Sequence, residues 1–128
     1  MALACPNRIA GVAYLRVDGV QYALKANLTI SIDSFIREGV PGMDGVHGYK
    51  ETPQTPYISA EISDLGGLSL QNLRAMCNNT VTAELANGKT YILRNAWTAA
   101  AMELNVADGQ VTVRWEGMRG EELLAQAA

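Results

Sequence analysis

The sequence has few aromatic residues, no long apolar run and no secretion signal. It holds one phenylalanine, Phe35, and two tryptophans in 128 residues, so its core must be built mainly from Val, Ile, Leu and Ala. No apolar segment approaches the roughly 20 residues that a membrane-spanning helix needs. The opening "MALACPNRIA" lacks the basic and apolar regions of a signal peptide. These absences predict a soluble chain that is made in the cytosol and does not enter a membrane.

Clustered positive charge is also absent. The chain carries 13 acidic and 10 basic residues, a formal charge of -3 and a pI of about 5.0, and it has no run of Lys or Arg. A protein that grips the phosphate backbone needs a cationic face. The composition therefore argues against tight binding of nucleic acid.

Residues that could carry catalysis or bind a metal are sparse. Cys5 and Cys77 stand far apart without a C-x-x-C motif, which favours two free thiols. His47 is the only histidine, and its neighbours Asp44 and Glu51 lie in a segment expected to be a loop. The spacing favours a solvated or interface histidine over a metal ligand or general base. We predict no enzyme activity, no cofactor and no metal.

The glycine-rich stretch "GVPGMDGVHG" has the composition of a phosphate-binding loop. It lacks the Gly-Lys-Ser/Thr ending that places a lysine on phosphate and a hydroxyl on magnesium. No G-x-S-x-G nucleophile motif is present either. The stretch is therefore not expected to bind a nucleotide.

What the sequence does contain is a set of hairpin turns. Asp18-Gly19, Asn87-Gly88 and Asp108-Gly109 each lie between runs of alternating apolar residues, a pattern typical of β-hairpins. The expected strands include Ile9 to Val17, Val20 to Asp33 and Tyr57 to Asp64, followed by the two later hairpins. About seven strands in one domain over residues 1–128 predict a mostly β protein, a β-sandwich or partly closed barrel.

In one segment the apolar residues are spaced as in a helix rather than alternating as in a strand. In "GGLSLQNLRAMCNN" the residues Leu70, Leu73, Met76 and Cys77 form an apolar stripe with helical spacing. Ser69 is a suitable N-cap. The pattern predicts one short helix from Leu70 to Cys77.

Three segments do not fit a regular element. Residues 38–57, "EGVPGMDGVHGYKETPQTPY", predict a long loop, and loops of this length are usually functional or disordered. Residues 118–128 predict a frayed end or a docking arm. The run "AWTAAAM", Ala96 to Met102, contains three consecutive alanines, which are poor strand formers. It is either a tightly packed strand face or a surface where a neighbouring subunit or a lumen demands small side chains.

Trp97 and Trp115 are interpreted as packing residues of the sheet. Base-stacking platforms are interleaved with basic residues, and only Arg94 and Arg114 lie near these tryptophans.

Taken in order, several of these segments resemble a known family. "GVHGYKETPQTPYISAEI", the short helix, "TVTAELANGKTYILRNAW" and "GQVTVRWEG" are similar to the tail tube proteins of contractile-tailed, Mu-like bacteriophages. The likeness runs from about Ile9 to Gly117.

The resemblance implies a structural subunit of a virion tail, assembled in the host cytoplasm. Copies would form hexameric rings whose sheets join into an inner β-barrel, and the rings would stack into a tube that conducts DNA during ejection. Sheath, baseplate and tail-terminator proteins would be partners, with no membrane and no small-molecule substrate. The long loop would contact the adjacent subunit or ring, through residues expected to be Gly42, Asp44, Val46, His47, Gly48, Tyr49, Lys50 and Glu51.

Two other functions remain open at this point. An inner-tube protein of a secretion system or tailocin would have the same fold and differ in gene neighbourhood. A monomeric small-molecule-binding β-barrel would enclose one apolar pocket and stay monomeric at any concentration.

Overall fold

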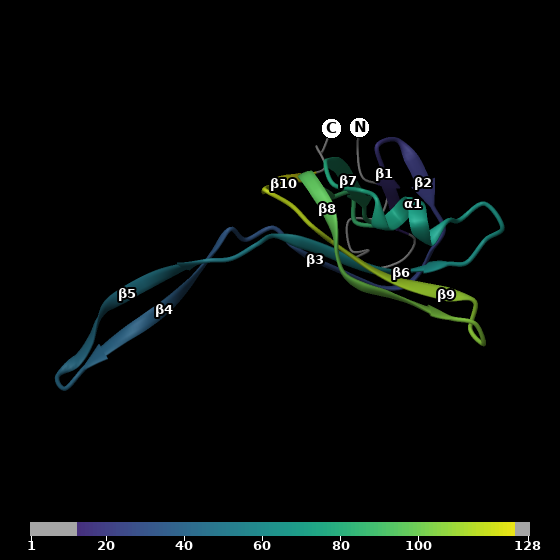
Figure 1. The fold of residues 1–128 in the computed structure, drawn as a ribbon. Helices are drawn as coiled ribbons and strands as arrows, with labels where there is room; N and C mark the ends of the chain where they lie inside the picture. Colours follow the sequence, from purple (N-terminus) through teal and green to yellow (C-terminus); the bar gives the residue numbers. More distant parts are fainter. Residues whose placement is uncertain (1–12, 125–128) are drawn as a thin grey trace.

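Ten strands and one short helix make up residues 13–124, the part of the chain that the computed structural model describes (Figure 1). The elements are β1 (Tyr14–Val17), β2 (Val20–Tyr22), β3 (Leu24–Ser31), β4 (Phe35–Gly42), β5 (Gly45–Pro53), β6 (Tyr57–Ser63), α1 (Leu70–Arg74), β7 (Asn79–Glu84), β8 (Thr90–Asn105), β9 (Gln110–Glu116) and β10 (Arg119–Leu123). The mostly β prediction with one short helix is confirmed, although the strands outnumber the predicted seven.

The body consists of two sheets that share strand β8. The first half of β8 pairs with β7 and β10, which together with β1 and β2 form what we call the β7 sheet. From Trp97 onward β8 pairs with β9, and the β9 sheet continues through β6 to β3. Asn95, with φ of 52°, stands at the change of sheet, and Asn tolerates this left-handed conformation. The two sheets do not close into a barrel.

The core lies between these sheets. Its largest side chain is Trp115, which has no exposed surface. The alternation predicted for the β6 and β9 segments is confirmed, because the apolar residues of each strand are buried and the polar ones are not. The buried apolar residues are Leu15, Val17, Ile58, Ala60, Ile62, Leu73, Val81, Ala83, Leu93, Ala96, Val111, Val113 and Trp115.

The three predicted turns are confirmed. Gly19, Gly88 and Gly109 all have positive φ, at 84°, 88° and 63°, a conformation that glycine adopts readily. Asp18-Gly19 is a two-residue turn between Val17 and Val20, whereas the turns that contain Gly88 and Gly109 are longer. The predicted strand from Val20 to Asp33 is divided, however. Its first part, β2, pairs with β1, whereas β3 crosses to the other sheet and pairs with β6.

Helix α1 is shorter than predicted. Ser69 is its N-cap and accepts a hydrogen bond from the Asn72 backbone N–H at 3.3 Å, which confirms the predicted cap. The helix ends at Arg74 rather than Cys77, because the Met76 N–H bonds to Leu73 O in a tighter turn that leads toward β7. Leu73 is the helix residue that reaches the core.

The predicted long loop is instead a β-hairpin. Strands β4 and β5 pair from Phe35 opposite Pro53 to Gly42 opposite Gly45, around a two-residue turn of Met43 and Asp44. This hairpin, Phe35–Pro53, is called the arm below. Figure 1 shows it extending away from the two sheets, connected to them through β3 and β6.

The predicted C-terminal tail is also partly ordered. Residues Arg119–Leu123 form β10 and pair with the start of β8. Gly120 lies so close to the end of β3 that an added Cβ would stand 2.7 Å from Ile32 Cβ. The frayed-end interpretation is therefore wrong for these residues, whereas residues 125–128 lie outside the described part of the chain.

Candidate assembly surfaces

Every residue predicted to form a subunit contact lies at the turn of the arm or on β5. The structure brings Gly42, Asp44, Val46, His47, Gly48, Tyr49, Lys50 and Glu51 onto one hairpin, and all of them except Gly42 are exposed. None of the buried core residues belongs to the arm. The arm is thus an appendage that makes no contribution to the core of its own subunit.

Cross-strand pairs of side chains hold the arm together. On one face the Arg37 guanidinium lies 5.1 Å from the ring centres of both Phe35 and Tyr49, and its Nε is 3.7 Å from Glu51 Oε1. On the other face Lys50 Nζ is 3.6 Å from Glu38 Oε2. Exposed ion pairs stabilise by at most about 1 kcal/mol each. A two-stranded hairpin held in this way is marginally stable in water on its own.

The arm also exposes large apolar side chains. Large hydrophobic residues are exposed on both faces and at the tip, where Met43 is fully exposed. An arm without a core of its own therefore exposes several large apolar side chains to solvent. The exposed apolar residues of the arm are Phe35, Ile36, Val40, Met43, Val46 and Tyr49.

The tip has a defined shape. The His47 Nε2–H donates to Asp44 Oδ1 at 2.5 Å, and this hydrogen bond lowers the pKa of the Asp44 carboxyl. The imidazole covers Gly42, where an added Cβ would lie 2.1 Å from His47 Cε1. Residues 13–124 contain no group of three or more His, Cys, Asp or Glu side chains that could hold a metal ion. His47 thus connects Asp44 and Gly42 at the tip through a hydrogen bond and a close packing contact.

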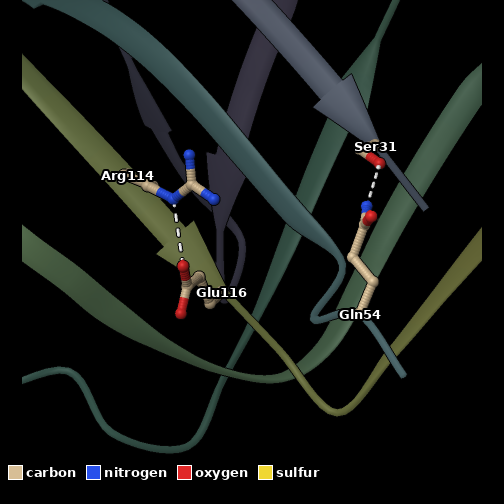
Figure 2. Close-up of polar contacts among 4 residues, drawn as sticks. All are labelled: Ser31, Gln54, Arg114 and Glu116. Carbon is tan, nitrogen blue, oxygen red and sulfur yellow. Dashed lines mark hydrogen bonds and ion pairs between the residues drawn. The ribbon is translucent and has the colours of Figure 1, made fainter. Parts of the chain in front are cut away.

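Hydrogen bonds orient the arm where it joins the body. Figure 2 shows the Gln54 side chain directed at Ser31, with Nε2 3.4 Å from Oγ. The Gln54 N–H also donates to Ser34 O at 2.9 Å. Next to this joint, Arg114 Nε donates to Glu116 at 3.0 Å (Figure 2). The Arg114 guanidinium also lies 3.8 Å from the centre of the Tyr57 ring. These contacts fix the ends of β3 and β6 between which the arm is inserted.

The β9 sheet has two free edges in the described part of the chain. Strand β3 pairs only with β6, and the second half of β8 pairs only with β9. Apart from Thr98 N–H, which donates to Met76 O, these edges present backbone N–H and C=O groups that can pair with another chain. The two edges lie on opposite sides of the same sheet.

The outer face of the β9 sheet is mostly polar. Most of the residues that alternate with the core positions carry hydroxyl, amide or carboxylate groups, with Arg114 as a basic member paired to Glu116. By register this face includes Ser59, Glu61, Glu103, Thr112, Arg114 and Glu116, together with Tyr57, Trp97 and Ala99.

Sequence reasoning missed the β4 half of the arm, including Phe35 and Arg37. A signal was present, because Arg37-Glu38 and Lys50-Glu51 are placed symmetrically about the Met43-Asp44 turn. Opposite charges facing each other across two strands are typical of an antiparallel pair.

No helix among residues 13–124 has the length and apolar character needed to cross a membrane. The open sheets leave no enclosed barrel interior for a small molecule.

Comparison with known proteins identifies relatives. The sequence pattern of the family described as "Phage tail tube protein" matches residues 6–122. The chain is 30% identical over 93 residues to the tail tube protein of Escherichia phage Mu, covering 73% of this chain and 78% of that protein.

Solved structures with a similar fold come from contractile injection systems. The sheath-tube complex of an extracellular contractile injection system, PVC, in its extended state has a TM-score of 0.59 at 13% identity, over 93% of this chain and 94% of that chain. The tube-terminating cap of the anti-feeding prophage has a TM-score of 0.57 at 12% identity, over 98% and 100%. The PVC sheath/tube terminator has a TM-score of 0.56 at 15% identity, over 87% and 92%.

Proposed function

This chain belongs to the phage tail tube protein family and is a structural component of a tail, not an enzyme, and from this premise we propose that its copies form hexameric rings, stacked into a tube that conducts DNA. Its place is the virion tail, and we propose that the rings assemble in the host cytoplasm.

The two free edges of the β9 sheet carry this proposal. If β3 of one copy pairs with the second half of β8 of the next, each junction uses two different surfaces. A repeated contact of this heterologous kind closes into a ring when the rotation between copies allows it. Sheet joining satisfies the edge hydrogen bonds of both copies, and the β9 sheets of the ring become one continuous inner barrel.

In such a ring the polar outer face of the β9 sheet lines the lumen. The core-facing side of the sheet is occupied by Ile58, Val113 and Trp115, so only the other side is available to the channel. Hydroxyl and carboxylate groups suit a conduit for DNA, because a cationic wall would retain the polyanion by counterion release.

Thr112→Lys is expected to slow DNA ejection. Thr112 is exposed on the outer face, and its cross-strand neighbours Glu61 and Glu103 can pair with the new ammonium group, so the subunit should still fold. Each subunit then adds one positive charge to the wall that DNA passes. Ejection kinetics of assembled particles, followed by a DNA-binding dye, provide the measurement. Thr112→Gln is the matched neutral control, and equal ejection rates for both variants and the wild type would contradict the lumen assignment.

Electron microscopy of the purified, concentrated protein tests the ring proposal. We expect rings or tubes of uniform diameter, because edge pairing repeats the same contact between all copies. A particle that stays monomeric at millimolar concentration would overturn the proposal.

The partners follow from the same assignment. Known structures with this fold are described as a sheath-tube complex, a sheath/tube terminator and a tube-terminating cap. We propose that this chain likewise contacts a sheath, a terminator and a baseplate. An inner tube of an injection apparatus or tailocin is the alternative that the fold supports, and the neighbouring genes would distinguish it.

A further inference from the structure

A groove between α1 and β8 lies beside the β8 edge that the proposed ring contact uses. It has a volume of about 350 Å³ and is lined by Leu70, Arg74, Thr98, Ala100, Ala101 and Met102. Two hydrogen bonds tie its walls together: Thr98 Oγ1–H donates to Leu73 O at 2.5 Å, and the Thr98 N–H donates to Met76 O at 3.2 Å. These hydrogen bonds hold α1 and β8, the two walls of the groove, together.

The alanine run of the sequence forms one wall of this groove. Ala99 lies opposite Arg114 and Glu103 opposite Thr112, so three residues of β8 bulge out against one residue of β9. Ala100 has φ of 59°, while the other described non-glycine residues with positive φ are Asp or Asn. Alanine in this conformation costs about 1–2 kcal/mol. Backbone strain of this kind often occurs where a surface is shaped for a ligand.

The groove is apolar except for one cation. Leu70, Met102 and the alanines supply apolar surface, and the exposed Arg74 has no ion-pair partner among residues 13–124. Its ligand should therefore combine a small apolar side chain with a carboxylate.

The tip of the arm has this composition. Met43 is fully exposed, Val46 is 78% exposed, and the Asp44 carboxylate stands between them, held by His47. A carboxylate can accept further hydrogen bonds besides the one from His47, so Asp44 can still pair with an arginine.

Two other grooves suit the tip less well. One of about 460 Å³ contains Asp33 and Glu122, whose like charges disfavour Asp44. Another of about 270 Å³, lined by residues such as Val20, Tyr22 and Leu65, has no charged side chain. Charge complementarity thus selects the α1–β8 groove.

The arm cannot fill the groove of its own subunit, because it extends from the joint at β3 and β6 away from α1 (Figure 1). We propose that the α1–β8 groove receives the arm tip of a second copy, with Met43 against the apolar wall and Asp44 paired with Arg74. This inference rests on the proposed assembly function and names the two surfaces that meet.

A charge exchange tests the contact. Asp44→Arg and Arg74→Asp, each alone, should lower the amount of sedimentable tube about tenfold, because like charges then face each other across the contact. The double variant should restore assembly close to the wild-type level, which a general loss of stability would not do. Lys89→Asp, with the same charge change in the turn before β8, is the matched control and should assemble normally.

A second variant blocks the groove without changing charge. Ala101→Trp replaces an exposed alanine and should reduce tube formation while the subunit stays folded by circular dichroism. Wild-type assembly of Arg74→Asp or Ala101→Trp, or a double variant no better than the single ones, would overturn the inference and leave the tube proposal intact. Failure of the wild-type protein to form tubes would contradict the tube proposal itself.

Discussion

Removal of most of the arm is expected to give a folded subunit that no longer stacks into tubes. Replacing residues 37–51 by Asn-Gly leaves Ile36 opposite Thr52 and closes the shortened hairpin with a favourable two-residue turn. Because no core residue lies in the arm, the free energy of unfolding should change by less than about 1 kcal/mol. The exposed apolar surface that would contact another copy is lost, so assembly should fail.

Sedimentation and electron microscopy measure the loss of tubes, and chemical denaturation measures the stability of the free subunit. A suitable control keeps the whole arm and removes one charge outside it, by Lys89→Gln, because a substitution at a surface position usually has little effect on stability. Tubes of normal length from the shortened protein would show that the arm is not the assembly element. A shortened protein that fails to fold would show that the arm supports the core.

Among these variants, Trp115→Ala should cause the largest loss in the stability of the folded subunit. The side chain is completely buried between the sheets, and replacing a buried Trp by Ala usually costs about 3–5 kcal/mol through lost burial and the cavity left behind. The total stability of a domain is only about 5–15 kcal/mol. The variant should therefore be largely unfolded at moderate denaturant concentration, as measured by equilibrium denaturation.

Two further variants provide comparisons for the stability loss of Trp115→Ala. Trp97→Ala changes the same residue type on the adjacent strand, where the side chain is only partly buried beside Glu116, and should cost much less. Trp115→Phe should also cost less than Trp115→Ala, because it retains an aromatic ring and removes an indole N–H that lacks a hydrogen-bond partner. Equal losses for Trp97→Ala and Trp115→Ala would contradict the placement of the core.

The sequence predicted the parts of the fold that depend on burial and turns. The Asp-Gly and Asn-Gly turns and the alternation of Ile58, Ala60 and Ile62 specify local geometry directly. The division between β2 and β3 was not predictable, because the apolar pattern continues through Tyr22 and Leu24 while the strand changes partners. The sharing of β8 by two sheets is likewise a tertiary feature without a local signal.

The arm was missed for a different physical reason. Period-two alternation reveals strands with one buried face, and the arm has none, since its pairing depends on ion pairs and on Arg37 between two aromatic rings. Gly39, Pro41 and Gly42 further reduced the strand signal. The β10 segment was missed for the same reason, because Glu121 and Glu122 reach Arg94 and Tyr91 rather than the core.

The shared strand has a mechanical consequence. Strand β8 belongs to both sheets over its 16 residues. Pulling one sheet away from the other would therefore break the backbone hydrogen bonds that β8 makes in both sheets at the same time. Such a domain should resist tension as one cooperative unit. In the proposed tube, the contacts between copies depend on single strand edges and on the slender arm. A tube built from this subunit should therefore fracture between rings or between neighbours, releasing intact subunits, before any subunit is torn open.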